Sequence, residues 1–370
     1  MKKIAFVPHK ERISRHKLEY LKAISKAMDD PYQSEDGREP NDLELELAEK
    51  CSHLTTNKHF LFTDSCTQAL QVAIYALSKP NDLILVPAYG WRAFANSVLF
   101  MGRRIEFIDI DVSGNISTNL LIERLKNQSK EKPRIAIIVH NFGAITETQE
   151  ISKIAREQNV SIVEDAAPAF FMQDPIISSK PGTYSDFVCY SFDFTKYPGT
   201  LGSGGAIATN NKDLHLLAKE IISHGRDSIT KSIKSVGTKC YMDNISKAVL
   251  STEIDIHIKE GYREKRRNVA EWYKKNLDLK HIPGDNQIWE RYTVYVPNCV
   301  QINNMLYNLN KEGILAKTFF KEPLNKLFKS DQICCMTTRF VNYTFHLPSH
   351  QYLDISDLEK IRSTLKGNIS

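Results

Sequence analysis

Between residues 55 and 210, short apolar runs rich in β-branched residues alternate with segments whose apolar residues recur at helical spacing. Parallel strands need long crossovers, which helices usually supply, and such helices bury both faces of the sheet. The alternation therefore predicts an α/β fold with a mainly parallel, seven-stranded sheet. The expected strands are His59–Thr63, Leu83–Pro87, Ile105–Asp109, Ile135–His140, Ser161–Asp165, Phe187–Phe192 and Gly205–Thr209, with helices near 67–78, 92–101, 118–127 and 147–158.

The pattern changes after residue 211. Helical periodicity covers 211–224 and about 244–277, and the remainder reads as strand, helix, strand, strand and helix, which predicts a smaller C-terminal α/β domain. We expect a large domain over 1–245 with an N-terminal arm, then a long connecting helix and the small domain over 246–370. The polar segment Pro31–Pro40 is typical of a loop. The expected C-terminal elements are strands Tyr292–Val300, Ile314–Lys317 and Tyr343–Leu347 and helices Gln301–Glu312 and 355–366.

Composition excludes several classes of function. The 370 residues contain 49 Lys and Arg against 44 Asp and Glu, and the net charge of +5 is too small to require a nucleic-acid partner. No apolar run approaches the roughly 20 residues of a membrane-spanning helix, and the N-terminal apolar stretch is too short for a signal peptide. The seven cysteines lack zinc-ligand spacing. We therefore expect a cytoplasmic protein with reduced cysteines and no membrane or metal partner.

Three short segments place reactive side chains where open parallel sheets bind ligands, at strand ends and helix starts. Asp165 ends one strand beside Glu164, and because successive strand side chains point to opposite faces, only one of the two can face a site. Lys196 follows another strand and enters a glycine-rich stretch, a pattern that an ordinary surface lysine would also fit. Ser65–Thr67 opens a helix, where free N–H groups favour phosphate but where a plain N-cap is equally expected.

Together with further blocks, these segments resemble the DegT/DnrJ/StrS family of sugar aminotransferases, which are pyridoxal-phosphate enzymes of fold type I. The blocks occur in the family's order, and the resemblance extends from Gly37 to about Leu365. It implies an aspartate-aminotransferase-like fold, pyridoxal 5'-phosphate as cofactor, and a homodimer with shared active sites. The six blocks are Asp64–Leu70, Val86–Asn96, Val139–Gly143, Glu164–Ala167, Ser191–Gly205 and Leu347–His350.

The resemblance assigns roles by position. Lys196 corresponds to the lysine that binds the cofactor covalently and, once released, moves a proton between substrate and cofactor. Asp165 corresponds to the acid that keeps the pyridine nitrogen protonated, so that the ring remains an electron sink. Trp91 takes the place of the aromatic residue that stacks on the ring, although taken alone it would be read as a core aromatic.

The phosphate group is expected to be held by Thr67 with the backbone of Cys66, and by Ser191. A partner subunit usually completes this site, and the matching stretch here carries Lys239 where many members have asparagine. The resemblance also places Gly37 and His350 near the substrate.

Two other positions depart from the family pattern. Pro168 stands where most members carry a glutamine or histidine that reaches the cofactor or substrate. Cys66 replaces a common glycine, a variant associated with members that act on nucleotide-linked 4-keto sugars. Neither departure affects the pair Lys196 and Asp165.

These residues predict transamination of a nucleotide-linked keto sugar, a dTDP-4-keto-6-deoxyhexose, with L-glutamate as donor and 2-oxoglutarate as product. The amino sugar would serve lipopolysaccharide O-antigen, other surface polysaccharide or natural-product biosynthesis. The alternatives are a 3-keto sugar or a GDP- or UDP-linked sugar, a pyridoxal-phosphate-dependent sugar dehydratase or isomerase, and a non-catalytic protein on the same fold. Relatives that act as dehydratases replace the lysine with histidine, whereas this chain keeps Lys196.

Overall fold

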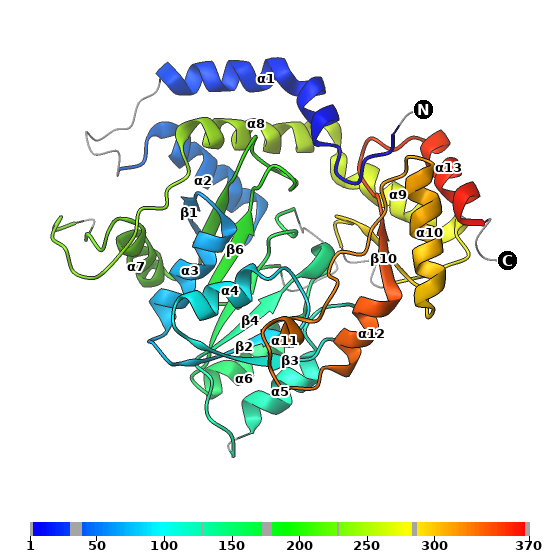
Figure 1. Ribbon diagram of the computed structural model, residues 1–370. Coiled ribbons are helices and arrows are strands. Elements are labelled where there is room, and N and C mark those ends of the chain that lie inside the picture. The colour runs from blue at the N-terminus through cyan, green and yellow to red at the C-terminus, as the bar shows by residue number, and fades with distance from the viewer. Residues whose placement is uncertain are drawn as a thin grey trace.

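The computed structural model describes residues 3–29, 39–127, 129–171, 180–227, 229–282 and 287–366. Its centre is a seven-stranded sheet in the order β1-β7-β6-β5-β4-β2-β3 (Figure 1). The five neighbouring strands β6, β5, β4, β2 and β3 run parallel, whereas β7 runs antiparallel to both β6 and β1. The predicted mainly parallel sheet is confirmed. The strands are β1 (His59–Thr63), β2 (Leu83–Pro87), β3 (Arg104–Ile108), β4 (Ile135–Val139), β5 (Ser161–Asp165), β6 (Phe187–Ser191) and β7 (Gly205–Thr209).

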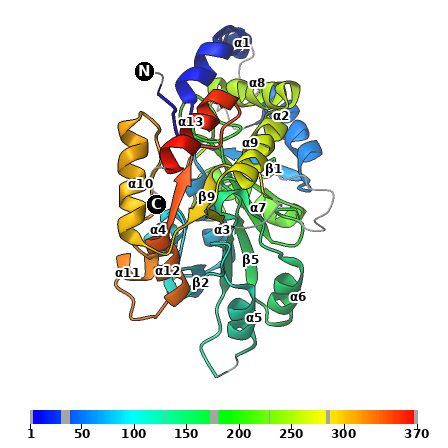
Figure 2. The ribbon, with the colours of Figure 1, turned by 90° about the vertical axis from the view of Figure 1, so that its right-hand side faces the viewer.

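Helices cover both faces of this sheet, because its strands are apolar on both sides. In β2, Ile84 and Val86 pack with α3, α4 and α7, whereas Leu85 between them packs with α5 and α6. Helices α2 and α8 cover the second face near β1 and β6, and Figure 2 shows α5 and α6 together on one side of the strands. The helices are α2 (Asp42–Leu54), α3 (Cys66–Leu77), α4 (Ala93–Phe100), α5 (Thr118–Lys126), α6 (Gln149–Glu157), α7 (Lys212–Ile222) and α8 (Asn244–Glu260).

A second, antiparallel sheet in the order β10-β9-β8 forms the C-terminal part of the chain. Its apolar face packs against α9, α10 and α13 in a separate hydrophobic core. The predicted boundary at 245/246 falls in the first turn of α8 and stays a prediction. The elements are β8 (Lys280–His281), β9 (Tyr292–Tyr295), β10 (Thr344–Leu347), α9 (Tyr262–Asn276), α10 (Cys299–Lys311), α11 (Leu324–Leu327), α12 (Cys335–Tyr343) and α13 (Ile355–Lys366).

Three local predictions in this part were wrong. The helix expected over 244–277 is two helices, because Gly261 adopts a left-handed conformation with φ of 62° and ends α8. The strand expected to reach Val300 stops at Tyr295, since Asn298 caps α10 by accepting hydrogen bonds from the N–H groups of Val300 and Gln301. Segment 314–317 is not a strand and makes only single bridges to Ile4 and His346.

The N-terminal arm contains a helix that the sequence pattern did not reveal, α1 (His9–Asp29), which lies along α8 (Figure 1). Its buried face includes Arg12, His16 and Tyr20, so it lacks a clear apolar stripe. The loop predicted over 31–40 falls mainly on residues 31–38, outside the described residues. Within the described ranges, no helix is long and apolar enough to cross a membrane.

Candidate active site

A cavity of about 610 Å³ opens beyond the carboxyl ends of β4, β5 and β6, between the large sheet and the segments that lead to the small one. The large-sheet side contributes the strand ends, the start of α3 and the loop after β6, and the other side contributes residues from 290–291 and 317–320. Its lining includes Ser65, Cys66, Thr67, Trp91, Asn141, Asp165, Pro168, Ser191, Asp193, Lys196, Glu290, Arg291, Lys317, Phe319 and Phe320.

Asp165 and Glu164 point to opposite faces of the sheet, as predicted. The Asp165 side chain lines the cavity, where its Oδ1 accepts a 3.0 Å hydrogen bond from the Ala167 N–H and lies 3.9 Å from the Cys66 Sγ. Glu164 is buried on the other side, 2.7 Å from His140 Nε2. Burial raises the pKa of Asp165, because the ionised form loses its hydration. A cationic partner inside the cavity would stabilise that carboxylate.

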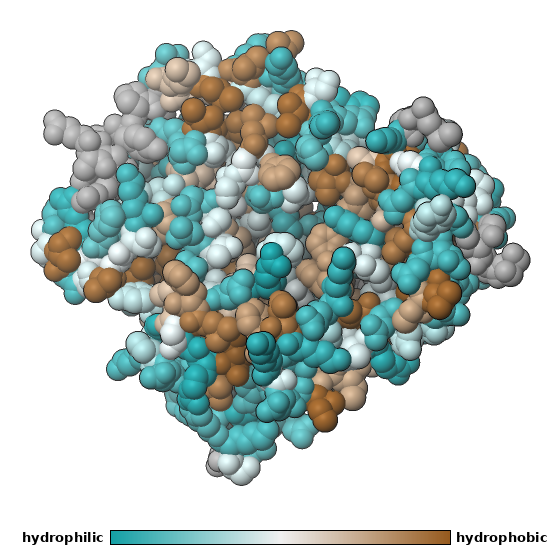
Figure 3. All heavy atoms as spheres, in the orientation of Figure 1, coloured by the Kyte–Doolittle hydropathy of each residue, from teal (hydrophilic) through white to brown (hydrophobic). Residues whose placement is uncertain are grey.

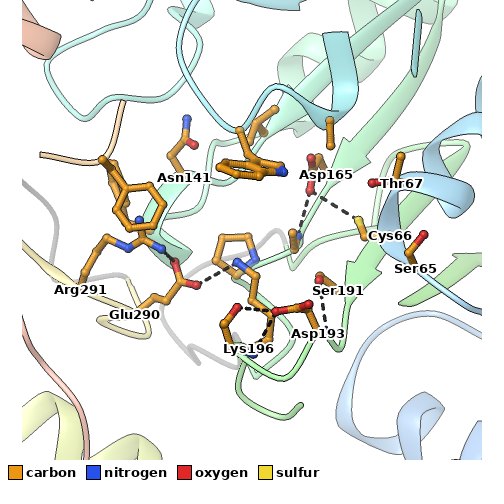
Figure 4. Close-up of a pocket in the computed structure, with 18 of the residues that line it drawn as sticks. Ser65, Cys66, Thr67, Asn141, Asp165, Ser191, Asp193, Lys196, Glu290 and Arg291 are labelled. Atoms are coloured by element: carbon orange, nitrogen blue, oxygen red, sulfur yellow. Dashed lines mark hydrogen bonds and ion pairs between the residues drawn. The ribbon is translucent and has the colours of Figure 1, made fainter. Parts of the chain in front are cut away.

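Lys196 carries its amine into the cavity from the loop after β6, between Asp165 on one side and Glu290 on the other (Figure 4). The Nζ donates a 2.9 Å hydrogen bond to Glu290 Oε1, while Glu290 Oε2 lies 2.9 Å from Arg291 Nη2. Burial alone would raise the pKa of Glu290, but the positive charges of Arg291 and Lys196 outweigh it and lower the pKa to about 2.

The N-terminus of α3 forms a polar end of the cavity. Ser65 caps the helix by accepting a hydrogen bond from the Gln68 N–H, whereas the N–H groups that precede Gln68 in the first turn have no acceptor within the helix. Gly205 lets the backbone at the start of β7 lie close to the start of α3, because a Cβ at this position would lie only 2.3 Å from the Cys66 nitrogen. Thr67 and Ser191, which are predicted to hold the phosphate, both line the cavity. Free N–H groups, hydroxyls and the helix dipole together suit a phosphate group.

Trp91 follows β2 in the cavity wall and is 55% exposed, which argues against a core aromatic and agrees with a ring available for stacking. Its ring lies 6.4 Å from that of Phe320, on the opposite wall. Pro168 also lines the cavity, and its side chain offers no hydrogen-bonding group.

The opposite wall was not predicted from the sequence. Arg291 is buried, with its guanidinium 3.5 Å from the centre of the Phe319 ring, and Lys317 lies 4.7 Å from the same ring. Burial lowers the pKa of Lys317, and the nearby Arg291 charge adds to this effect. No motif marks these residues, because Glu290 and Arg291 precede an ordinary strand and Lys317 lies in a segment that only single bridges hold.

Two predicted residues that the structure describes lie outside the cavity lining of this single chain. Lys239 is exposed in the segment between α7 and α8. His350 is buried, with its Nε2 3.0 Å from the Ala5 carbonyl oxygen and its Nδ1 accepting the Tyr352 N–H. Gly37 falls outside the described residues. The role of each stays a prediction.

The DegT/DnrJ/EryC1/StrS aminotransferase family model matches residues 15–366. This chain belongs to that family. The predicted enzyme class, a pyridoxal-phosphate-dependent sugar aminotransferase, is thereby confirmed.

Two characterised relatives align with this aminotransferase over most of their length. The UDP-2-acetamido-2-deoxy-3-oxo-D-glucuronate aminotransferase of Pseudomonas aeruginosa is 26% identical over 86% of this chain and 89% of the relative. The UDP-4-amino-4,6-dideoxy-N-acetyl-beta-L-altrosamine transaminase of Campylobacter jejuni is 29% identical over 93% of each.

Two solved structures share the fold of this aminotransferase. A DegT DnrJ EryC1 StrS aminotransferase from Brucella abortus has a TM-score of 0.86 at 23% identity, covering 99% of this chain and 100% of that one. NtdA from Bacillus subtilis, solved with the cofactor PMP, has a TM-score of 0.87 at 19% identity, covering 100% of this chain and 86% of NtdA. The predicted fold class is confirmed.

The residues present in the aminotransferase fit pyridoxal phosphate. The start of α3, made accessible by Gly205, offers N–H groups for its phosphate, and Asp165 offers a buried carboxylate for a protonated ring nitrogen. Lys196 offers a primary amine in the same cavity.

The low pKa of Glu290 predicts a pH-dependent contribution to stability. Because the folded pKa lies near 2 and the ordinary value is 4.5, this stabilisation is nearly complete at pH 6 and is lost as the pH falls through 4.5 towards 2. The difference in unfolding free energy between wild type and Glu290→Gln should shrink by about 1 kcal/mol from pH 6 to pH 4. Urea titrations at each pH measure this difference. Parallel stability curves would show that Glu290 is not held as an anion.

Proposed function

We propose that this aminotransferase transfers the amino group of L-glutamate to a nucleotide-linked keto sugar, a dTDP-4-keto-6-deoxyhexose, and releases 2-oxoglutarate. The observation that carries the proposal is that Lys196, Asp165 and a helix start suited to phosphate line one cavity. A UDP-linked sugar is the second candidate, because both relatives named above are named for UDP-linked sugars. The product would serve surface-polysaccharide, including lipopolysaccharide, or natural-product biosynthesis.

Each residue has a distinct task in this proposal. Bound pyridoxal phosphate supplies an electron sink for the carbon that exchanges its amino group. Asp165 would hold the ring nitrogen in its protonated form, and the amine of Lys196 would take the proton from the amino-bearing carbon of glutamate and, in the second half-reaction, give a proton to the former keto carbon of the sugar. Trp91 would cover a face of the ring, and the opposite wall would restrict water around the reacting atoms.

A substrate panel tests the proposal. The purified enzyme is incubated with dTDP-, UDP- and GDP-linked 3-keto and 4-keto sugars, with and without L-glutamate, and amino-sugar formation is scored by mass spectrometry. We expect a glutamate-dependent product with one nucleotide and one keto position. Loss of water or isomerisation without amino transfer would instead support the dehydratase or isomerase alternative.

We further propose a homodimer in which each subunit completes its partner's site. Apolar side chains lie exposed over α1 and α8, where Figure 3 shows brown patches, and in the segment after α7. They are Leu18, Leu21 and Met28 on α1, Ile245 and Ile258 on α8, and Ile229, Ile233 and Val236 after α7. The last group is close in sequence to Lys239.

A cytoplasmic location is also proposed. It is supported by the seven cysteines, which are all unpaired in the structure.

If Lys239 reaches the partner's phosphate site, Lys239→Ala should weaken cofactor affinity by about 1–2 kcal/mol, the scale of one charged hydrogen bond. Equilibrium dialysis of pyridoxal phosphate measures the change, with Lys231→Ala, an exposed lysine in the same segment, as control.

Mixing subunits tests whether the site is shared. In a hybrid of Lys239→Ala and Lys196→Ala chains, one site carries both changes and the other carries neither. Recovery of activity at limiting cofactor would support the shared site. Unchanged cofactor affinity in Lys239→Ala alone would contradict the contact.

A further inference from the structure

The guanidinium of Arg12 on α1 contacts the backbone on both sides of the turn that follows the catalytic lysine. Its Nη1 donates a 3.2 Å hydrogen bond to the carbonyl oxygen of Lys196 itself, and its Nη2 donates a 3.0 Å bond to the carbonyl oxygen of Thr200. Arg12 is 1% exposed. A residue 184 positions away in sequence therefore holds the backbone from which the reactive amine extends.

The turn itself has little freedom to adapt. The Lys196 N–H donates to the Asp193 carbonyl oxygen at 2.7 Å, and the Thr200 N–H donates to that of Phe192 at 2.8 Å. At Gly199 a Cβ would lie 2.5 Å from the Asp193 carbonyl oxygen and 3.0 Å from Arg12 Nη1. The guanidinium thus packs directly against the glycine of the turn, leaving no space between α1 and this backbone.

Arg12 also forms an ion pair with α8, which is longer than its two hydrogen bonds to the carbonyl oxygens. Its Nη1 lies 3.5 Å from Glu253 Oε1, and the Tyr20 hydroxyl, further along α1, donates a hydrogen bond to the Glu253 Oε2. Glu253 is completely buried, so α1 and α8 share a charge pair that no solvent reaches. A second arginine also contacts this turn. The guanidinium carbon of Arg266 on α9 lies 3.8 Å from the centre of the ring of Tyr197, the residue that follows Lys196.

We propose that Arg12 is a positioning residue for catalysis, which makes the N-terminal helix α1 part of the active-site structure. The two hydrogen bonds fix the backbone at Lys196, so the four flexible bonds of its side chain start from a defined point and direction. This inference rests on the proposed role of Lys196. It goes beyond that role because it assigns a function to a residue outside the cavity.

The test measures covalent attachment of pyridoxal phosphate to Lys196 in the cofactor-free protein, without any sugar. The rate is followed by absorbance, and the site by borohydride reduction and peptide mapping. Arg12→Met should slow attachment on the order of ten- to a hundredfold, because an ångström-scale misplacement of a reactive group costs rates of this size. Arg12→Lys keeps the charge but reaches fewer carbonyl oxygens, so we expect an intermediate rate.

Two controls separate positioning from stability. Glu253→Gln removes the buried ion pair but keeps the guanidinium against the carbonyl oxygens, and Arg15→Met changes an exposed arginine on the same helix. Both should attach the cofactor within about twofold of the wild-type rate, whatever their melting temperatures. The inference is overturned if Arg12→Met attaches at the wild-type rate, or if Glu253→Gln is slowed equally.

The remaining outcomes are also decisive. If Arg12→Met does not fold, Arg12→Lys carries the test, and a wild-type rate of attachment in that variant overturns the inference. If the wild-type protein does not attach the cofactor at Lys196, the assignment of the lysine fails rather than that of Arg12.

Discussion

Lys196→Ala should lose transamination by at least about 10⁴-fold, because a positioned acid–base group alone supplies up to that factor and the covalent link is lost as well. The cofactor should still dock through its phosphate, since the start of α3 is unchanged. After borohydride reduction of the wild-type protein, peptide mapping should find the pyridoxyl group on Lys196.

Lys317→Ala is the matched control, because Lys317 is a second lysine in the lining of the same cavity. We expect this variant to retain the label on Lys196. A pyridoxyl group on Lys317, or on any other lysine of the wild-type protein, would contradict the assignment.

Asp165→Asn should slow the half-reaction with glutamate by at least about a hundredfold, because losing one preorganised electrostatic partner of the reacting group costs about 10²–10³ in rate. The amide can still accept the Ala167 N–H, so the fold and the melting temperature should change little. Stopped-flow loss of visible absorbance on mixing with glutamate measures the rate.

A cofactor analogue with a methylated ring nitrogen separates charge from structure in the Asp165→Asn variant. Such a ring stays positive whatever residue faces it, so it should restore part of the lost rate. Asp193→Asn, a change of another carboxylate in the cavity lining, should leave the rate nearly unchanged because Asp193 caps its own turn through Thr195. An unaltered rate in Asp165→Asn would show that this residue does not face the ring nitrogen.

The large sheet could be predicted from the sequence because its strands are buried on both faces and appear as continuous apolar runs between amphipathic helices. The antiparallel direction of β7 could not, since Gly205–Thr209 is equally apolar in either direction. Helix α1 gave no signal for a related reason. Its buried side chains are Arg12, His16 and Tyr20, whose value lies in specific hydrogen bonds rather than in apolar burial.

The candidate site likewise contains residues that local sequence patterns predict and residues that they do not. Lys196, Asp165, Ser191 and the start of α3 occur in compact local patterns, and the structure brings them into one cavity. Glu290 and Arg291 reach the site only because the segment before β9 lies against the large sheet, where Glu290 pairs with Lys196. No local sequence pattern predicts this long-range contact. The sequence-based prediction therefore covered the wall that is expected to face the cofactor and missed the other.

One cavity wall comes from the large sheet and its loops, and the other comes from segments beside the small sheet. This division affects how the sequence of such a protein can change during evolution. Side chains expected to hold the cofactor belong to the large sheet and its loops, whereas residues 290–291 and 317–320 belong to segments beside the small sheet, which has its own hydrophobic core. Mutations can alter the size and charge of the second wall while leaving the strands that carry Asp165 and precede Lys196 intact. The range of substrates can thus change during evolution while the chemistry of the enzyme is kept.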